Sequence, residues 1–259
     1  PKESRGRPQT SSVFIALWNL LNSPFTEKKT TCNTEKKSFY FFLAKKKEPT
    51  GGRTMAKAAD VYFQVDPWKV IEQGFDPAYA RVSESIFSLG NESIGVRGCF
   101  DEGGHVDSLR GAYTNGIYDM EKLSRSYKGI IDKTHFMIPS AEWLMTTISV
   151  DGETLDLGQS QFSDFTRELD LRAGTLTRRF LWTTKSGKQI RLTFLRFLDM
   201  VHRERAYQRI TLEALTFTGS ATVTSGVSFD VVHEGRQKCF WQETRIDATP
   251  DCLMAQSHT

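Results

Sequence analysis

Leu176-Thr-Arg-Arg-Phe-Leu-Trp-Thr-Thr184 and Gln189-Ile-Arg-Leu-Thr-Phe-Leu-Arg-Phe197 are two runs separated by Lys185-Ser-Gly-Lys188. A short link that contains glycine, placed between two runs of this composition, predicts a β-hairpin. In the second run apolar and polar residues alternate, so the two sets lie on opposite faces of a strand. The apolar set is Ile190, Leu192 and Phe194, and the polar set is Gln189, Arg191 and Thr193.

The same pattern extends to both sides of this hairpin. Thr147-Ile-Ser-Val150 and Glu153-Thr-Leu-Asp-Leu157 flank Asp151-Gly152, a dipeptide that favours tight hairpin turns because both residues can take a positive φ. The alternation recurs at Ile210, Leu212 and Ala214, and at Ala221, Val223, Ser225 and Val227. Hairpins with one apolar face each must bury those faces against another sheet. The sequence therefore predicts an all-β fold, a large antiparallel β-sandwich.

The net charge of the chain differs before and after its first methionine, Met55. Residues 1–54 contain 11 Lys and Arg against 4 Asp and Glu, a net charge of +7. Residues 55–259 contain 23 Lys and Arg against 27 Asp and Glu, a net charge of −4. The basic balance of the whole chain therefore comes from the leader, and we expect no nucleic-acid partner. The remaining 205 residues suffice for one sizeable all-β domain, which we place at 55–259.

The leader, residues 1–54, shows neither a sustained period of 2 nor one of 3.6. Its apolar stretch Val13-Phe-Ile-Ala-Leu-Trp-Asn-Leu-Leu21 resembles the core of a signal peptide, but it is far too short to cross a membrane as a helix. We interpret the leader as a disordered tail, or as sequence that precedes a true start at Met55. We expect no membrane partner.

The cysteines indicate the redox setting. Cys32, Cys99, Cys239 and Cys252 form neither a CxxC pair nor a dense framework, so we expect buried free thiols rather than disulfides or zinc ligands. A reducing, cytoplasmic location fits this pattern. The region from Asp66 to Tyr118 is rich in glycine and less regular, and we expect short strands and loops that cover one edge of the sandwich.

Within that region, five polar side chains allow two interpretations. They could form a loop that reaches a sugar pocket. Alternatively Arg97 pairs with Glu84 or Glu102, Asn91 takes a left-handed turn conformation, and the glycines meet backbone demands. We favour the second, structural interpretation. The five residues are Asn91, Arg97, Asp101, Glu102 and His105.

Aromatic and acidic residues give no clear site. Sugar-binding sandwiches stack sugars on exposed aromatic rings, but large aromatics in a sandwich are more often core. Glycosidic cleavage ordinarily needs two carboxyls about 5–10 Å apart. Glu168 and Asp170 would share a strand face beside Arg167 and Arg172, which suits a salt-bridged surface better. We assign no catalytic, cofactor-binding or metal-binding residue. The tryptophans considered are Trp68, Trp143, Trp182 and Trp241, and the other acidic pair is Asp101 and Glu102.

Several segments, in order, resemble the N-terminal domain of glycoside hydrolase family 65, the phosphorylases of maltose, trehalose, kojibiose and related α-glucosides. The resemblance reaches from about Val65 to about Glu243. It departs from the family after Gly90-Asn91, where Glu92-Ser93 replaces a second glycine. Its segments are Val65–Trp68, Gly74–Pro77, Glu84–Asn91, Gly95–Gly98, Phe100–Glu102, Gly111–Tyr118, Val150–Leu157, Arg167–Arg178, Arg196–Met200 and Phe240-Trp241.

The resemblance implies a supersandwich-like domain that precedes a helical barrel, and it places the catalytic acid and the phosphate site in that barrel. We see no helical repeat here and expect the chain to be a fragment, open at both ends. The intact enzyme would cleave a disaccharide by inverting phosphorolysis, with inorganic phosphate as co-substrate and no other cofactor. Phe240-Trp241 and Val65–Trp68 favour maltose.

Three functions stay open at this point. The chain is the non-catalytic part of a family 65 phosphorylase or hydrolase, a free-standing carbohydrate-binding sandwich, or a structural or dimer-forming domain with an apolar patch left bare. The sequence does not decide the disaccharide, the linkage, the acceptor or whether a homodimer forms.

Overall fold

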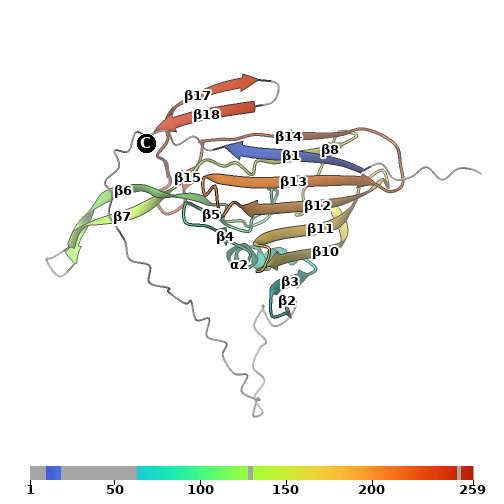
Figure 1. Ribbon diagram of the computed structural model, residues 1–259, viewed down its shortest axis with the longest axis horizontal. Helices are drawn as coiled ribbons and strands as arrows, with labels where there is room; N and C mark the ends of the chain where they lie inside the picture. The colour runs from blue at the N-terminus through green and yellow to red at the C-terminus, as the bar shows by residue number, and fades with distance from the viewer. Residues whose placement is uncertain (1–9, 19–62, 128–130, 250–251, 259) are drawn as a thin grey trace, which may run out of the picture.

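The computed structural model describes residues 10–18, 63–127, 131–249 and 252–258 (Figure 1). Most of the leader, including Cys32, lies outside these residues. Within the leader, Thr10–Trp18 forms β1, which pairs antiparallel with β13, Arg205–Ala214. The sequence analysis did not predict β1.

One large antiparallel sheet has the order β1-β13-β12-β11-β10-β3-β2. It contains the hairpin predicted from the sequence, with Trp182 on β11 opposite Ile190 on β12. Its inner face carries Phe180, Trp182, Ile190, Leu192 and Phe194, all buried. The predicted alternation is therefore confirmed on β12, and β11 shows the same alternation. The further bounds are β2 Phe63–Val65, β3 Lys69–Gln73, β10 Gln161–Asp170, β11 Thr175–Thr183 and β12 Gln189–Leu198.

Two smaller sheets, β14-β8-β9 and β4-β5-β6-β7, supply the second layer. Ile148 and Val150 of β8 join the core cluster that holds Phe180 and Leu192, whereas Ile94 of β5 belongs to a second cluster. Each small sheet thus covers a different part of the inner face, and the predicted β-sandwich is confirmed. The bounds are β4 Leu89–Gly90, β5 Ile94–Val96, β6 Ala112–Tyr127, β7 Ile131–Pro139, β8 Thr146–Val150, β9 Glu153–Thr154 and β14 Ala221–Ser225.

The two residues of the turn between β8 and β9 have the predicted backbone conformation. Asp151 and Gly152 have φ of 51° and 79°, so both central residues lie in the left-handed region. Aspartate tolerates this conformation and glycine favours it, which explains why this dipeptide closes a two-residue hairpin.

The region from 66 to 118 is more structured than expected. β2 and β3 extend one edge of the large sheet, as predicted, but a 3-10 turn at Pro77–Tyr79 (η1) and helix α2 at Ala80–Ile86 follow. The helix has only seven residues, too few for a helical period to show in the sequence. β6 and β7 form a long hairpin that projects from the sandwich (Figure 1). We call β6 and β7 the arm.

Short hairpins complete the described chain. β15, Val232–His233, pairs with β16, Lys238–Cys239, and β17, Gln242–Thr249, pairs with β18, Cys252–His258. In the part of the chain that the structure describes, no helix has the length and apolar character that a membrane crossing requires.

The described cysteines are free, as expected. Cys99 is buried, but Cys239 is half-buried and Cys252 is exposed. The expectation of buried thiols is therefore wrong for Cys252, which lies on a hairpin outside the two core clusters.

Replacing Leu192 by alanine tests the position of the core. Leu192 is fully buried, so we expect the free energy of unfolding to fall by about 2–5 kcal/mol. Leu171→Ala is the matched control, because Leu171 is 56% exposed and its loss should change stability by no more than about 0.5 kcal/mol. Urea unfolding of both variants measures the difference, and equal midpoints would contradict the assigned inner face.

Candidate functional site

Polar side chains lie across the inner face of the large sheet on five adjacent strands. Arg167 on β10 is opposite Arg178 on β11 and, on the other side, opposite Glu72 on β3. Arg196 on β12 is opposite Gln208 on β13. All five side chains are buried. We call these five residues the polar row.

The polar row divides the core in two. Along β11, Leu176 belongs to one apolar cluster and Phe180 to the other, with Arg178 between them. Along β12, Phe194 and Leu198 lie on either side of Arg196 in the same way. A charged group on the inner face of a sheet is stable only when it is paired and hydrogen-bonded. The polar row therefore requires partners from the second layer.

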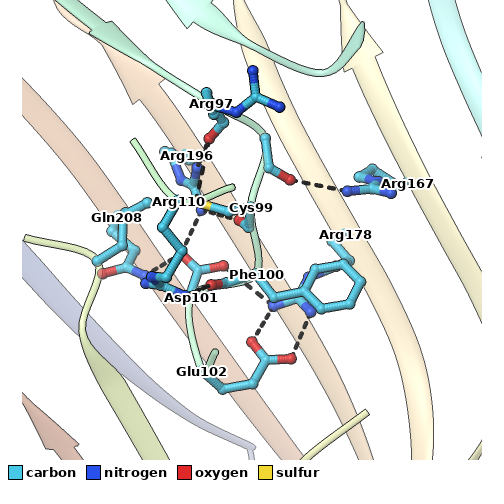
Figure 2. Close-up of polar contacts among 12 residues, drawn as sticks. Arg97, Cys99, Phe100, Asp101, Glu102, Arg110, Arg167, Arg178, Arg196 and Gln208 are labelled. Atoms are coloured by element: carbon cyan, nitrogen blue, oxygen red, sulfur yellow. Dashed lines mark hydrogen bonds and ion pairs between the residues drawn. The ribbon is translucent and has the colours of Figure 1, made fainter. Parts of the chain in front are cut away.

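A loop at residues 97–102, after β5, supplies carboxylates to the polar row (Figure 2). Asp101 Oδ1 accepts hydrogen bonds from Arg196 Nη2 at 2.9 Å and from Gln208 Nε2, and Asp101 Oδ2 accepts one from Arg178 Nη2 at 3.2 Å. Glu102 binds Arg178 through both of its oxygens, with 2.6 Å between Arg178 Nη1 and Glu102 Oε1. Bidentate carboxylate pairing of this kind fixes the orientation of a guanidinium.

The backbone of the same loop also contributes acceptors. Arg196 donates to the carbonyl oxygens of Arg97 and Cys99, each at 3.0 Å, and Arg167 Nη1 donates to the carbonyl oxygen of Gly98 at 2.9 Å. Gly98 has a steric reason to be glycine, because a Cβ there would lie 2.7 Å from Cβ of Phe87. The expectation that glycines in this segment meet backbone demands is confirmed at Gly98.

Arg167 has its own carboxylate partner at the edge of the polar row. Arg167 Nε donates to Glu72 Oε2 at 2.6 Å, and Ser83 Oγ on α2 donates to Glu72 Oε1 at 2.7 Å. The Arg167 guanidinium also lies over the Phe87 ring, 4.7 Å from its centroid. These contacts attach α2 to the sheet through one buried ion pair.

The charges of the polar row and its loop balance. Burial disfavours the ionised form of Asp101 and by itself would raise the pKa of that carboxyl, but the charges of Arg196 and Arg178 and the hydrogen bonds from Arg196 and Gln208 outweigh it. The pKa of Asp101 is therefore held below its ordinary value. Three arginines face three acids, namely Arg167, Arg178 and Arg196 against Glu72, Asp101 and Glu102.

This arrangement joins the two layers and leaves no room for a sugar ring between them. A cavity between the loop and the polar row has a volume of about 10 Å³, room for about one water molecule. A carboxyl whose pKa is lowered by two arginines is also a poor general acid, because an acid catalyst needs a raised pKa. Residues that line this cavity are Gly98, Cys99, Asp101, Arg167, Leu176, Arg178, Phe194 and Arg196.

The five polar residues singled out from the sequence do not converge. Asp101 and Glu102 point into the polar row. Arg97 lies 3.9 Å from Glu84, so that predicted pairing is confirmed, whereas Glu102 pairs with Arg178 instead. Of the two predicted partners of Arg97, the structure selects Glu84.

Asn91 and His105 lie elsewhere. Asn91 is not among the described non-glycine residues with a positive φ, so the predicted left-handed conformation is wrong. Its side chain bridges two turns instead: Oδ1 accepts from Ser93 N and Ile94 N, and Nδ2 donates to the carbonyl oxygens of Asp199 and Arg203. His105 contacts Asp156 through its ring and its backbone amide.

The other residues that the sequence analysis considered lie on the surface or in the core. Glu168 and Asp170 both face Lys69, at 2.8 and 3.9 Å, so the salt-bridged surface is confirmed, although Arg167 on the opposite face is buried. Trp143 and Trp182 are buried, Trp241 is half-buried, and Trp68 is 49% exposed beneath the Arg172 guanidinium. Among the described residues, no group of three or more His, Cys, Asp or Glu could hold a metal ion.

The sequence analysis missed the polar row, although a signal was present. Arg196 has the same parity as Ile190, Leu192 and Phe194, which places it on the inner face. Arg178 likewise continues the buried set of its strand. An arginine at a core-facing position on neighbouring strands predicts a buried ion-pair network, but its acids came from a loop that the alternation does not locate.

Replacing Arg178 by methionine tests the polar row. Glu102 and Asp101 would lose a buried cationic partner, so we expect the free energy of unfolding to fall by about 3–5 kcal/mol. Arg191→Met is the control, because the Arg191–Glu213 pair is exposed and worth about 1 kcal/mol or less. Equal losses in chemical denaturation would refute the buried network.

Asp101→Asn should flatten the acid dependence of stability. The folded pKa of Asp101 lies below the unfolded one, so its stabilisation is complete above the ordinary value of 3.8 and is lost as the pH falls through and below it. Urea unfolding between pH 2 and 7 measures the slope. Asp170→Asn, at an exposed carboxyl whose pKa is also lowered, chiefly by a backbone hydrogen bond from Ala173, provides the comparison. An unchanged slope in Asp101→Asn would contradict the ion-pair geometry.

The chain matches a family model described as "Glycosyl hydrolase family 65, N-terminal domain" over residues 70–258. The sequence analysis placed the resemblance at about 65 to 243, so the match starts slightly later and extends through β18. The matched range contains the whole polar row and the loop that neutralises it.

Curated relatives cover the same part of the chain. An uncharacterized glycosyl hydrolase of Mycobacterium tuberculosis is 33% identical over 165 residues, which are 63% of this chain and 21% of that protein. Maltose phosphorylase of Bacillus subtilis is 31% identical over 185 residues, which are 70% of this chain and 24% of the relative. The chain therefore spans about a quarter or less of the length of these relatives.

A solved structure agrees with these matches. A putative kojibiose phosphorylase from human microbiome superposes with a TM-score of 0.68 at 36% sequence identity, covering 74% of this chain and 25% of that one. The family model covers well over half of the chain. The chain therefore belongs to glycoside hydrolase family 65 and contains its N-terminal domain.

Proposed function

We propose that this chain is the non-catalytic N-terminal part of an enzyme that cleaves α-glucosidic disaccharides by inverting phosphorolysis. The observation that carries the proposal is the match to the family 65 N-terminal domain, supported by relatives named as phosphorylases of maltose, α,α-trehalose and kojibiose. Because the chain spans only 21–25% of the relatives' length, the activity is proposed for the whole protein.

The proposed reaction needs a disaccharide and inorganic phosphate, with no other cofactor. An acid protonates the glycosidic oxygen while phosphate attacks the anomeric carbon from the opposite face. The carbon–oxygen bond to the leaving sugar breaks, a carbon–oxygen bond to phosphate forms, and the proton stays on the released hydroxyl. For maltose, our preferred substrate, the products are β-glucose 1-phosphate and glucose.

We propose that the acidic residues of the loop at 97–102 do not take these roles. Asp101 and Glu102 are each bound to arginine, and the cavity beside Asp101 has a volume of about 10 Å³, too small for a sugar ring. We therefore propose that the disaccharide and the phosphate bind in the larger part of the enzyme and that this domain serves it as a rigid support. The free thiols of the described cysteines favour a reducing, cytoplasmic location.

An assay of the complete protein tests the proposal. The reading frame that contains this chain is expressed whole and incubated with maltose, trehalose and kojibiose, with and without phosphate. We expect phosphate-dependent release of β-glucose 1-phosphate, fastest with maltose. Release of glucose at the same rate without phosphate would make the enzyme a hydrolase, and a frame without a catalytic domain would leave a carbohydrate-binding or structural sandwich instead.

A further inference from the structure

One strand of the large sheet comes from outside the segment that the family model matches. The match covers residues 70–258, whereas β1, Thr10–Trp18, lies in the leader. β1 pairs antiparallel with β13 in consecutive register, from Thr10 opposite Glu213 to Trp18 opposite Arg205, and Figure 1 shows it in blue alongside β13. β13 is thus bordered on one side by the matched domain and on the other by a strand of the leader.

Without β1, β13 would be the last strand of the large sheet. In the sheet order of the described chain, β1 comes at the end and β13 is its one neighbour. An edge strand presents unpaired backbone N–H and C=O groups along its free side. Gln208 and Ile210 of β13 are buried, so this edge also borders the core. A row of backbone groups beside apolar positions is what an added strand uses for binding.

The register brings apolar residues of β1 to the positions that border the core. Val13 is opposite Ile210, and Leu17 is opposite Ala206. Residues directly opposite each other in an antiparallel pair lie on the same face of the sheet. Because Ala206 and Ile210 belong to the buried inner face, positions 13 and 17 belong to that face as well.

Position 15 lies at the end of the polar row. Ile15 is opposite Gln208, whose Nε2 donates to Asp101 Oδ1 within the buried network. Asp101 also pairs with Arg196. Hydrogen bonds and ion pairs of this kind are stronger where water is excluded. An apolar residue at position 15 therefore suits the place where the polar row would otherwise meet solvent.

The residues of β1 have the composition of an added strand. The segment contains no charged residue, no glycine and no proline, and Val13, Ile15 and Trp18 are types that favour strands. A charge at an inner-face position would be buried without a partner, and a proline would remove a backbone donor. Phe14 and Ala16, at the alternate positions, are apolar too, which is why the sequence shows no clear alternation here.

A long connection joins β1 to the rest of the sheet. Residues 19–62 separate β1 from β2, and these two strands stand at opposite ends of the sheet order. No tight turn therefore fixes β1 next to β13, as a hairpin turn fixes β12 next to β11. Its pairing with β13 is what positions it, so β1 behaves as a ligand of this edge that the same chain carries.

We propose that the β13 edge is a binding site for an extended, uncharged peptide strand, and that the leader segment Thr10–Trp18 is the ligand that occupies it. Backbone pairing supplies the affinity, and the apolar positions 13, 15 and 17 supply the selectivity. The leader thereby has a role that its sequence did not predict. A chain that starts at Met55 leaves the site open, whereas a chain that carries the leader closes it. The inner-face residues of the site are Ala206, Gln208, Ile210 and Leu212.

A cut between the leader and the domain tests the site. A site-specific protease sequence is inserted between Gly51 and Gly52 of the 259-residue chain, which is cleaved after it has folded. We expect the leader fragment to co-elute with the domain in size-exclusion chromatography and to separate from it in denaturing urea. Because the fragment is scored without first being removed, this experiment is decisive even where the isolated domain does not fold.

Proline variants of the same cleavable chain supply the comparison. Phe14→Pro/Ile15→Pro should release the fragment, because alternate backbone amides of an edge strand point into the sheet and two adjacent prolines must remove one of those donors. Lys28→Pro/Lys29→Pro, in the leader but outside β1, is the matched control and should retain the fragment. A parental fragment that leaves a folded domain, or equal retention of both variants, would overturn the proposal.

Titration with a synthetic peptide of residues 10–18 measures the binding directly. We expect one peptide to bind each domain freed of its leader, and the uncut chain, whose site is full, to bind none. The peptide with prolines at positions 14 and 15 should bind at least about tenfold more weakly, equivalent to about 1.4 kcal/mol. Equal binding to the freed and uncut chains would contradict the site. Freed domains that form dimers which the peptide does not dissociate would make a second copy the occupant instead.

Discussion

The buried ion pairs between the polar row and the loop at 97–102 are the constraint on which the two-layer structure depends. Arg178 and Arg196 lie on the inner face of the large sheet, where an unpaired cation would be strongly destabilising. Asp101 and Glu102 neutralise them from the other layer. Because neither half is stable without the other, the loop has one position on the sheet, and the two small sheets on either side of it are placed as a consequence.

The same pairing makes Asp101 unsuited to act as a general acid. An acid catalyst needs a carboxyl with a raised pKa and room for the substrate. Asp101 has a lowered pKa, and the neighbouring cavity accommodates about one water molecule. The polar row and its loop are therefore a structural feature of this domain.

The structure also gives structural tasks to two of the segments that carry the family resemblance, Glu84–Asn91 and Gly95–Gly98. Gly98 brings the loop backbone against Phe87, and Asn91 ties the β12–β13 turn to the turn before β5. The structural interpretation was favoured from the sequence, but residue types did not show which groups Gly98 and Asn91 contact, because glycine and asparagine in a loop also suit a sugar site. The hairpins, by contrast, were predictable, because alternation along β12 and the Asp151-Gly152 turn are local features.

The sequence by itself determined the all-β class, the central hairpins, the buried apolar set of β12, and the family. Each depends on residues close together in the chain or on motifs in a fixed order, so no tertiary contact is needed to see them. Only the tertiary structure decided which acid meets which arginine and which loop carries the acids. Those contacts join residues about 75 to 110 positions apart, and a pairing over such a distance depends on how whole layers pack rather than on local pattern.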